Sequence, residues 1–101
     1  MGNSIRVDHS VMRSTASSLR SVADGIIGTL NQTIGQMDDL SSSWQGSDYD
    51  TFIGRAHALR ENDSSIVSTS NTIRQYADWL ENAANMYQQA QAQAINKSLS
   101  L

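Results

Sequence analysis

The chain has 101 residues, a net charge of −3 and neither cysteine nor proline. Its length allows one domain, spanning residues 1–101, and the lack of cysteine excludes disulfides and any metal site built on thiolates. The basic residues are few and scattered, whereas a phosphate-binding surface needs them clustered, so we expect no nucleic-acid partner.

The N-terminal sequence carries no recognisable export or membrane signal. Residues 1–20 contain Arg6, Asp8, Arg13 and Arg20 and lack the apolar region of a signal peptide. No apolar run approaches the ~20 residues that a membrane-spanning helix needs. Composition alone therefore predicts a cytoplasmic protein without a cleavable signal peptide.

The first predicted element is a helix over about residues 8–40. Asp8 is the expected N-cap, with Val7 and Met12 placed as a hydrophobic staple across it. Between residues 19 and 44, apolar side chains recur at a mean step of about 3.6 residues, which is the α-helical period. The residues predicted to pack from this helix are Leu19, Val22, Ile26 and Leu30.

Three glycines interrupt this helix, namely Gly25, Gly28 and Gly35. Each lowers helix stability by up to ~1 kcal/mol relative to alanine. Two interpretations stay open. The glycines are tolerated irregularities, or the missing side chains allow a neighbouring helix to approach closely.

A turn is predicted at residues 41–47, around the tripeptide Trp44-Gln45-Gly46. Three serines precede the tripeptide and weaken the helix, and Gly46 can adopt the left-handed conformation that ends a helix. Ser47 is then the expected N-cap of a second helix, with Asp50 as its capping-box partner. Trp44 is expected to anchor the end of the hairpin with its large apolar surface.

The second helix is predicted over about residues 48–91. Positions 52, 56, 59, 63, 66, 70, 73, 77, 80, 84 and 87 are separated by alternating steps of four and three, which is a heptad seam. Nine of these eleven residues are apolar or aromatic, and the exceptions, Asp63 and Ser70, suggest a polar layer or a register pin. Residues 92–101 are expected to form a flexible tail. The residues predicted to pack from this helix are Phe52, Leu59, Ile66, Ile73 and Leu80.

Two long helices joined by a short turn lie antiparallel, so the predicted fold is an all-α helical hairpin. Each helix can cover only one side of the other, which leaves a broad apolar stripe in water. A second hairpin would cover that stripe. Burial alone therefore predicts a dimer in the form of an elongated four-helix bundle.

This combination resembles the WXG100 family, also called ESAT-6-like proteins. The resemblance rests on the length, the two-helix pattern and Trp44-Gln45-Gly46 at the turn, and it covers nearly the whole chain. It implies a hairpin that pairs head-to-tail, either with itself or with a related WXG100 protein. It also implies export from the cytoplasm by a type VII (ESX/Ess) secretion system, without a cleavable signal peptide, after recognition by an FtsK/SpoIIIE-type ATPase.

A second motif of the family, Tyr-x-x-x-Asp/Glu, lies near the C-terminus and forms part of the export signal. Its candidate here runs from Tyr87 to Gln91, where glutamine replaces the acid and keeps the hydrogen bonding but loses the charge. Either this is a degenerate signal of the kind found in homodimeric members, or a partner protein carries the complete motif. In the paired form, the resemblance places the turn of one subunit near the C-terminal motif of the other.

The residues give no support to catalysis, and no cofactor or metal is expected. The chain has no Ser-His-Asp set in a strained turn and no phosphate-binding loop. His9 and His57 have no ligand partner at helical spacing, and Asp38 and Asp39 fall at the unfavourable end of the first helix dipole without an explanation. Trp79 lies beside the seam and is expected to be partly buried.

The leading hypothesis is therefore a small, virulence-associated secreted protein that acts as a dimeric effector or as a carrier and chaperone for larger secreted substrates. The alternative is an intracellular helical adaptor with no export role. Membrane perturbation is a third possibility, which the scarcity of basic residues and the negative net charge disfavour.

Overall fold

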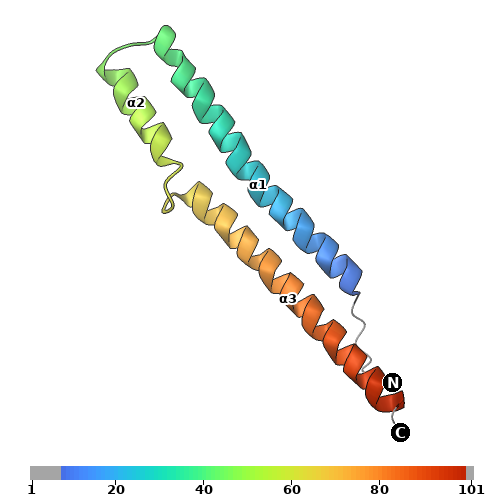
Figure 1. Cartoon of the computed structure of the whole chain (residues 1–101). Helices are drawn as coiled ribbons and strands as arrows, with labels where there is room; N and C mark the ends of the chain where they lie inside the picture. Colours follow the sequence, from blue (N-terminus) through green and yellow to red (C-terminus); the bar gives the residue numbers. More distant parts are fainter. Residues whose placement is uncertain (1–7, 100–101) are drawn as a thin grey trace, which may run out of the picture.

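The chain folds back on itself once, and its second arm is interrupted. The computed structural model describes residues 8–99, and for 98 and 99 it describes the backbone alone. The elements in chain order are α1 (His9–Asp39), the short 3-10 helix η1 (Leu40–Ser42), α2 (Ser47–Ala58) and α3 (Ser65–Leu99). Figure 1 shows α1 running antiparallel to α2 and α3 in a rod with extents of 79 × 25 × 19 Å. The predicted all-α helical hairpin is confirmed.

The start of α1 follows the predicted cap. The Asp8 side chain accepts a hydrogen bond from the backbone N–H of Val11 at 3.1 Å, which satisfies one of the free donors of the first turn. Val7, the other half of the predicted staple with Met12, lies outside the described residues. The helix then continues to Asp39, where η1 tightens its last turn.

The predicted continuous helix over residues 48–91 is wrong, because residues 59–64 separate α2 from α3. The backbone N–H groups of Leu59, Arg60 and Glu61 each bond three residues back, which ends α2. Ser64 then starts α3: its hydroxyl donates to the Leu59 carbonyl at 2.6 Å and accepts from the Val67 N–H at 3.2 Å. The physical reason is the run 62–64, Asn-Asp-Ser, whose short polar side chains favour caps and turns over helix interiors.

The segment expected to be a flexible tail is helical for most of its length. Helix α3 continues to Leu99, and residues 100 and 101 lie outside the described part of the chain. The segment 88–94 consists of glutamine and alanine, which have high helix propensity, so the helix persists although its side chains are exposed.

Small residues form the contact between α1 and α3. Ala16 and Ala23 on α1, and Ser70, Ala77 and Ala84 on α3, are at most 1% exposed, and they repeat every seven residues on each helix. The Ser70 hydroxyl donates to the Ala23 carbonyl at 3.0 Å. So short a side chain reaches a carbonyl of the other helix only when the two backbones lie close together. Ser70 thus links the two helices at one register, as its place in the seam suggested.

The larger residues predicted to pack lie at the edge of this contact. Leu30 is buried, and Ile34 on α1 is buried as well. Val22 is 53% exposed, which is the highest value among the predicted packing residues. The remaining ones are half-buried in the single chain: Leu19, Ile26, Phe52, Leu59, Ile66, Ile73 and Leu80.

One side of the hairpin is closed by polar bonds between α1 and α3. Arg20 forms ion pairs with Asp78 at 2.9 Å and with Glu81 at 2.5 Å, and Arg74 pairs with Asp24. The hydrogen bonds to Asp78 and then Glu81 hold the pKa of Arg20 above its ordinary value.

A third arginine continues this polar side towards the start of α1. Arg13 donates to Asn85 at 2.7 Å and to Gln88 at 2.5 Å. Exposed bonds of this kind each contribute little to stability. Their main effect is geometric, because they fix the register of the hairpin and leave the opposite side of the helix pair as the free one.

The three glycines of α1 do not serve a close contact within this chain. A Cβ atom built on Gly25, Gly28 or Gly35 would meet no other atom within 4 Å. Close approach of α3 to these positions is therefore excluded as their reason. Within residues 8–99, no helix is both long and apolar enough to cross a membrane.

Candidate functional site: the Trp-x-Gly turn

The turn holds Trp44 against the end of α1 through backbone bonds. The N–H groups of Ser43 and Trp44 both donate to the Leu40 carbonyl, at 2.9 and 2.8 Å. The side-chain amide of Gln45 reaches back to the Ser41 carbonyl at 3.3 Å. The Trp44 backbone is therefore fixed to η1 before the chain reverses.

Gly46 makes the reversal, but in a different way from the one predicted. Its φ of 130° and ψ of −179° lie in a region that is essentially restricted to glycine. It is the N-cap of α2 rather than the C-cap of α1, and its carbonyl accepts the first helical bond, from Asp50, at 3.0 Å. Ser47 is consequently the first residue of α2, and the predicted capping box with Asp50 does not form.

Three aromatic rings pack together at this turn. The Trp44 ring centroid lies 5.4 Å from that of Tyr49, at an interplanar angle of 67°, and 5.3 Å from that of Phe52. Tyr49 and Phe52 are 6.5 Å apart. Trp44 packs on these two rings of α2 and yet remains 39% exposed, so part of the residue faces water. We call Trp44, Tyr49 and Phe52 the aromatic corner.

Tyr49 is the residue of this corner that the sequence reasoning missed. It is 7% exposed, and its hydroxyl lies 3.1 Å from the carbonyl oxygens of both Met37 and Asp38 in the last turn of α1. Those carbonyls have few helical partners because α1 ends there. The heptad seam could have indicated it, because extending the seam by three residues before Phe52 reaches Tyr49.

A second link joins α2 to the end of α1. The His57 Nε2 atom lies 2.7 Å from the Asp38 carboxylate, with both side chains a little under half exposed. This contact explains why an acidic residue lies at the end of α1, and it gives His57 a partner. Spacing along a helix could not have indicated either point. Both links bind α2 to the same turn of α1.

The two predicted halves of the export signal are far apart within one chain. Tyr87, 45% exposed, and Gln91, also exposed, lie on α3. Figure 1 places that segment at the end of the rod opposite to the turn between α1 and α2. Because four residues separate Tyr87 and Gln91 on a helix, their side chains lie on similar sides of it. One chain by itself does not bring this segment to Trp44.

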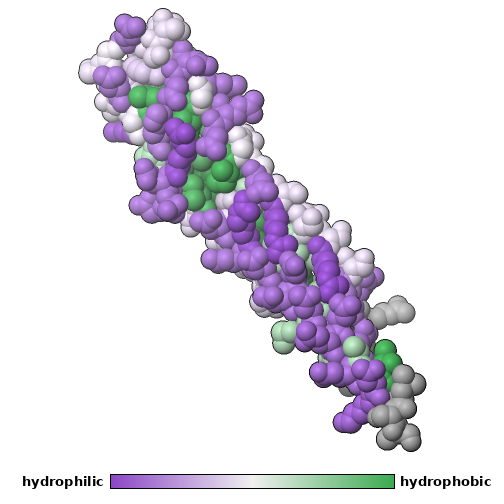
Figure 2. Space-filling view, viewed as in Figure 1, coloured by the Kyte–Doolittle hydropathy of each residue, from purple (hydrophilic) through white to green (hydrophobic). Residues whose placement is uncertain are grey.

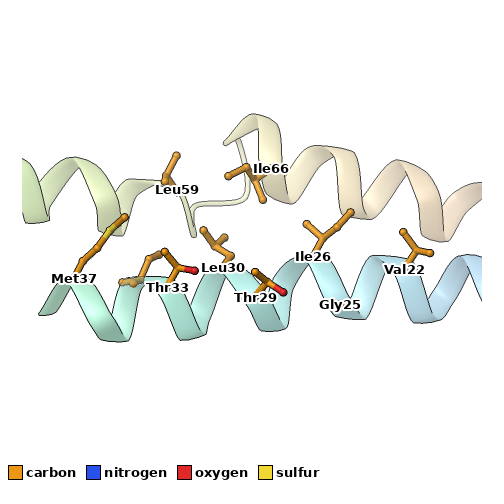
Figure 3. Close-up of a pocket in the computed structure, with 10 residues that line it drawn as sticks. Val22, Gly25, Ile26, Thr29, Leu30, Thr33, Met37, Leu59 and Ile66 are labelled. Carbon is orange, nitrogen blue, oxygen red and sulfur yellow. The ribbon is translucent and has the colours of Figure 1, made fainter. Parts of the chain in front are cut away.

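An apolar groove follows the open side of the hairpin. Its volume is about 700 Å³, and it runs along α1 past the point where α2 gives way to α3 (Figure 3). In Figure 2 the hydrophobic surface gathers in the half of the rod that contains α2, between the two arms. No lining residue is charged: they are Val22, Gly25, Ile26, Thr29, Leu30, Thr33, Ile34, Met37, Leu59 and Ile66.

Large apolar side chains are exposed on the other half of the rod. Tyr76 is 64% exposed and Met86 69% exposed on α3. Trp79 is 67% exposed, so the prediction that it is partly buried beside the seam is wrong for the single chain. Its position explains this, because residue 79 lies about 100° around the helix from seam residue 80. The groove and these bulky residues thus occupy different halves of the hairpin.

The comparisons with known proteins agree with the resemblance seen in the sequence. A family model described as WXG100, proteins of 100 residues with WXG, matches residues 4–92. The match includes Trp44-Gln45-Gly46 as well as Tyr87 and Gln91. No curated protein and no solved structure matches the chain significantly. Among residues 8–99, no group of three or more His, Cys, Asp or Glu side chains is placed to hold a metal ion.

Proposed function

This chain belongs to the WXG100 family, and from that premise we propose that it is a small protein exported by a type VII secretion system as a head-to-tail homodimer. The family itself implies a type VII secretion-associated protein. The observation that carries the proposal is the Trp-x-Gly tripeptide at the hairpin turn, with Trp44 partly exposed at the tip. An exposed indole held in a rigid turn suits recognition by another protein.

The homodimer is supported by the two different halves of the open side. The bonds from Arg13 to Asn85 and from Arg20 to Asp78 set a register in which Tyr76 is about level with Val22. The groove occupies the half nearer the turn, and Tyr76 and Tyr87 project from the half nearer the termini. A second copy turned end over end would bring its tyrosines to the groove of the first.

Such a pairing is isologous, since each copy supplies both the groove and the residues that fill it. In the proposed dimer, Tyr76 meets the Val22 end of the partner groove near the twofold axis, and Tyr87 meets the Met37 end. No charged residue has to lose water along the groove. Gly25 lines the groove, so close approach of the partner would explain a glycine at this position, which no contact within the single chain explains.

The same pairing would complete the signal. Turning one copy end over end brings its Tyr87–Gln91 segment to the end of the rod that carries the partner's Trp44. A composite surface of this kind would be presented to the secretion ATPase only by the folded dimer. We propose that the protein acts as a non-catalytic effector or as a carrier for larger secreted substrates, and that export starts from the cytoplasm.

The test is the amount of protein in cell-free medium from the native host, with and without its FtsK/SpoIIIE-type ATPase, with a cytoplasmic lysis marker as control. We expect extracellular protein only when the ATPase is intact. Retention in both strains would refute the export role and favour an intracellular adaptor. Trp44→Ala and truncation before residue 87 are each expected to reduce export, and Trp79→Phe is the matched aromatic control.

A further inference from the structure

Helix α2 depends on its own contacts for its position. The interruption at residues 59–64 separates it from α3, so the extensive packing of α3 on α1 does not fix the short helix. What joins it to α1 is the buried Ala56, the Tyr49 hydroxyl and the His57–Asp38 pair. The position of α2 therefore rests on a few residues.

Trp44 is supported from both arms. Its backbone bonds to Leu40 at the end of α1, whereas its indole packs on Tyr49 and Phe52 of α2. Tyr49 is the residue that connects the two supports. Its ring carries the indole, and its hydroxyl bonds to the Met37 and Asp38 carbonyls of α1.

We propose that Tyr49 is a positioning residue of the export turn, setting the direction in which the exposed edge of Trp44 faces its secretion partner. The inference rests on the proposed function of the turn. Leu40 is 40% exposed and Trp44 39% exposed, so the tip offers the partner an apolar surface. The partner surface that fits it is an apolar pocket that receives the indole edge.

Removal of the Tyr49 hydroxyl distinguishes a positioning role from simple packing of the ring. Tyr49→Phe keeps the ring beneath Trp44 and removes only the bonds to α1. Loss of a hydrogen bond of this kind increases the population of the loosened turn about fivefold, the factor that corresponds to about 1 kcal/mol. Helix content should change little, because α1 and α3 keep their own contacts.

The experiment uses full-length protein with Trp79→Phe, which leaves Trp44 as the single tryptophan. Acrylamide quenching and fluorescence anisotropy then report on Trp44 alone, and circular dichroism checks helicity. We expect Tyr49→Phe to increase quenching, lower anisotropy and reduce export into the medium. Ser17→Ala, which removes an exposed hydroxyl on α1 outside the turn and the groove, is the control and should leave Trp44 fluorescence unchanged.

A second variant covers the case in which Tyr49→Phe disturbs α2. Tyr49→Leu keeps an apolar side chain but removes both the ring and the hydroxyl, so the loss of anisotropy and of export should be larger still. Unchanged Trp44 quenching in both variants would overturn the inference. Looser Trp44 with normal export would also overturn it, because the orientation would then be irrelevant to recognition. Normal export of Trp44→Ala would instead refute the export role of the turn and leave the fluorescence result standing.

Discussion

Gly28→Ala is expected to stabilise the protein, and Gly25→Ala is expected to separate the stability of the single chain from that of the proposed dimer. Both glycines lie inside α1 with ordinary helical backbone, and a Cβ atom at either position meets nothing within 4 Å. Alanine in a helix interior is favoured over glycine by about 0.5–1 kcal/mol, chiefly because glycine loses more backbone entropy on folding.

The expected magnitude follows from the size of the chain. For a domain of about 100 residues, 1 kcal/mol shifts Tm by roughly 4–8 °C, so Gly28→Ala should raise Tm by about 2–8 °C. Gly28 is exposed and lies outside the groove, so this gain should not depend on protein concentration. Gly25 lines the groove. A methyl group there would occupy space that the proposed dimer assigns to the partner.

Thermal unfolding followed by circular dichroism over a hundredfold range of concentration distinguishes the two effects. Gly25→Ala should raise Tm at low protein concentration. At concentrations where the wild-type protein is found to be dimeric, this rise in Tm should become smaller or turn into a decrease. If Gly25→Ala and Gly28→Ala behave alike at every concentration, the groove does not receive a second copy closely. If Gly28→Ala lowers Tm, its side of α1 contacts something that the hairpin does not show.

Three further changes test other contacts. Ser70→Ala removes the bond to the Ala23 carbonyl and should cost about 0.5–1.5 kcal/mol in urea unfolding, and an unchanged midpoint would contradict its role as a cross-link. Tyr76→Glu places a charge at the proposed twofold axis and should shift the sedimenting species from dimer to monomer with helicity retained; a persistent dimer would place the interface elsewhere. Asp38→Ala removes the exposed contact with His57 and should lower stability by under ~1 kcal/mol, so a loss of several kcal/mol would mean that the pair does more than a surface contact.

Apolar periodicity was sufficient to predict the hairpin, because the packing of α1 on α3 depends on spacing along each helix. It failed at residues 59–64, because the heptad seam keeps its phase through the interruption, from Leu59 at its start to Ile66 just after it. The information that ends α2 is instead the local preference of Asn62, Asp63 and Ser64 for turns. A seam read across such a run overestimates the length of the helix.

The turn shows a different limit. The tripeptide Trp44-Gln45-Gly46 was sufficient to locate the turn, and extending the heptad seam one step back would have added Tyr49. The side-chain bonds at the turn could not be predicted from the sequence pattern. The His57–Asp38 pair joins residues 19 apart across the reversal, so it depends on the backbone angles of Gly46 and on the angle at which α2 leaves the turn. Such contacts arise from the folded geometry and have no spacing rule in the sequence.

The length of α3 has a mechanical consequence. The register set by Arg13 and Asn85 places His9, where α1 begins, about level with residue 89, so α3 extends roughly ten residues or ~15 Å beyond it. A pulling force applied to this extension of α3 loads the hairpin from its open end. The small-residue layers then separate in succession, first at Ala84, next at Ala77 and last at Ser70, instead of all at once. A hairpin opened one layer at a time resists pulling less than one whose helices must slide past each other.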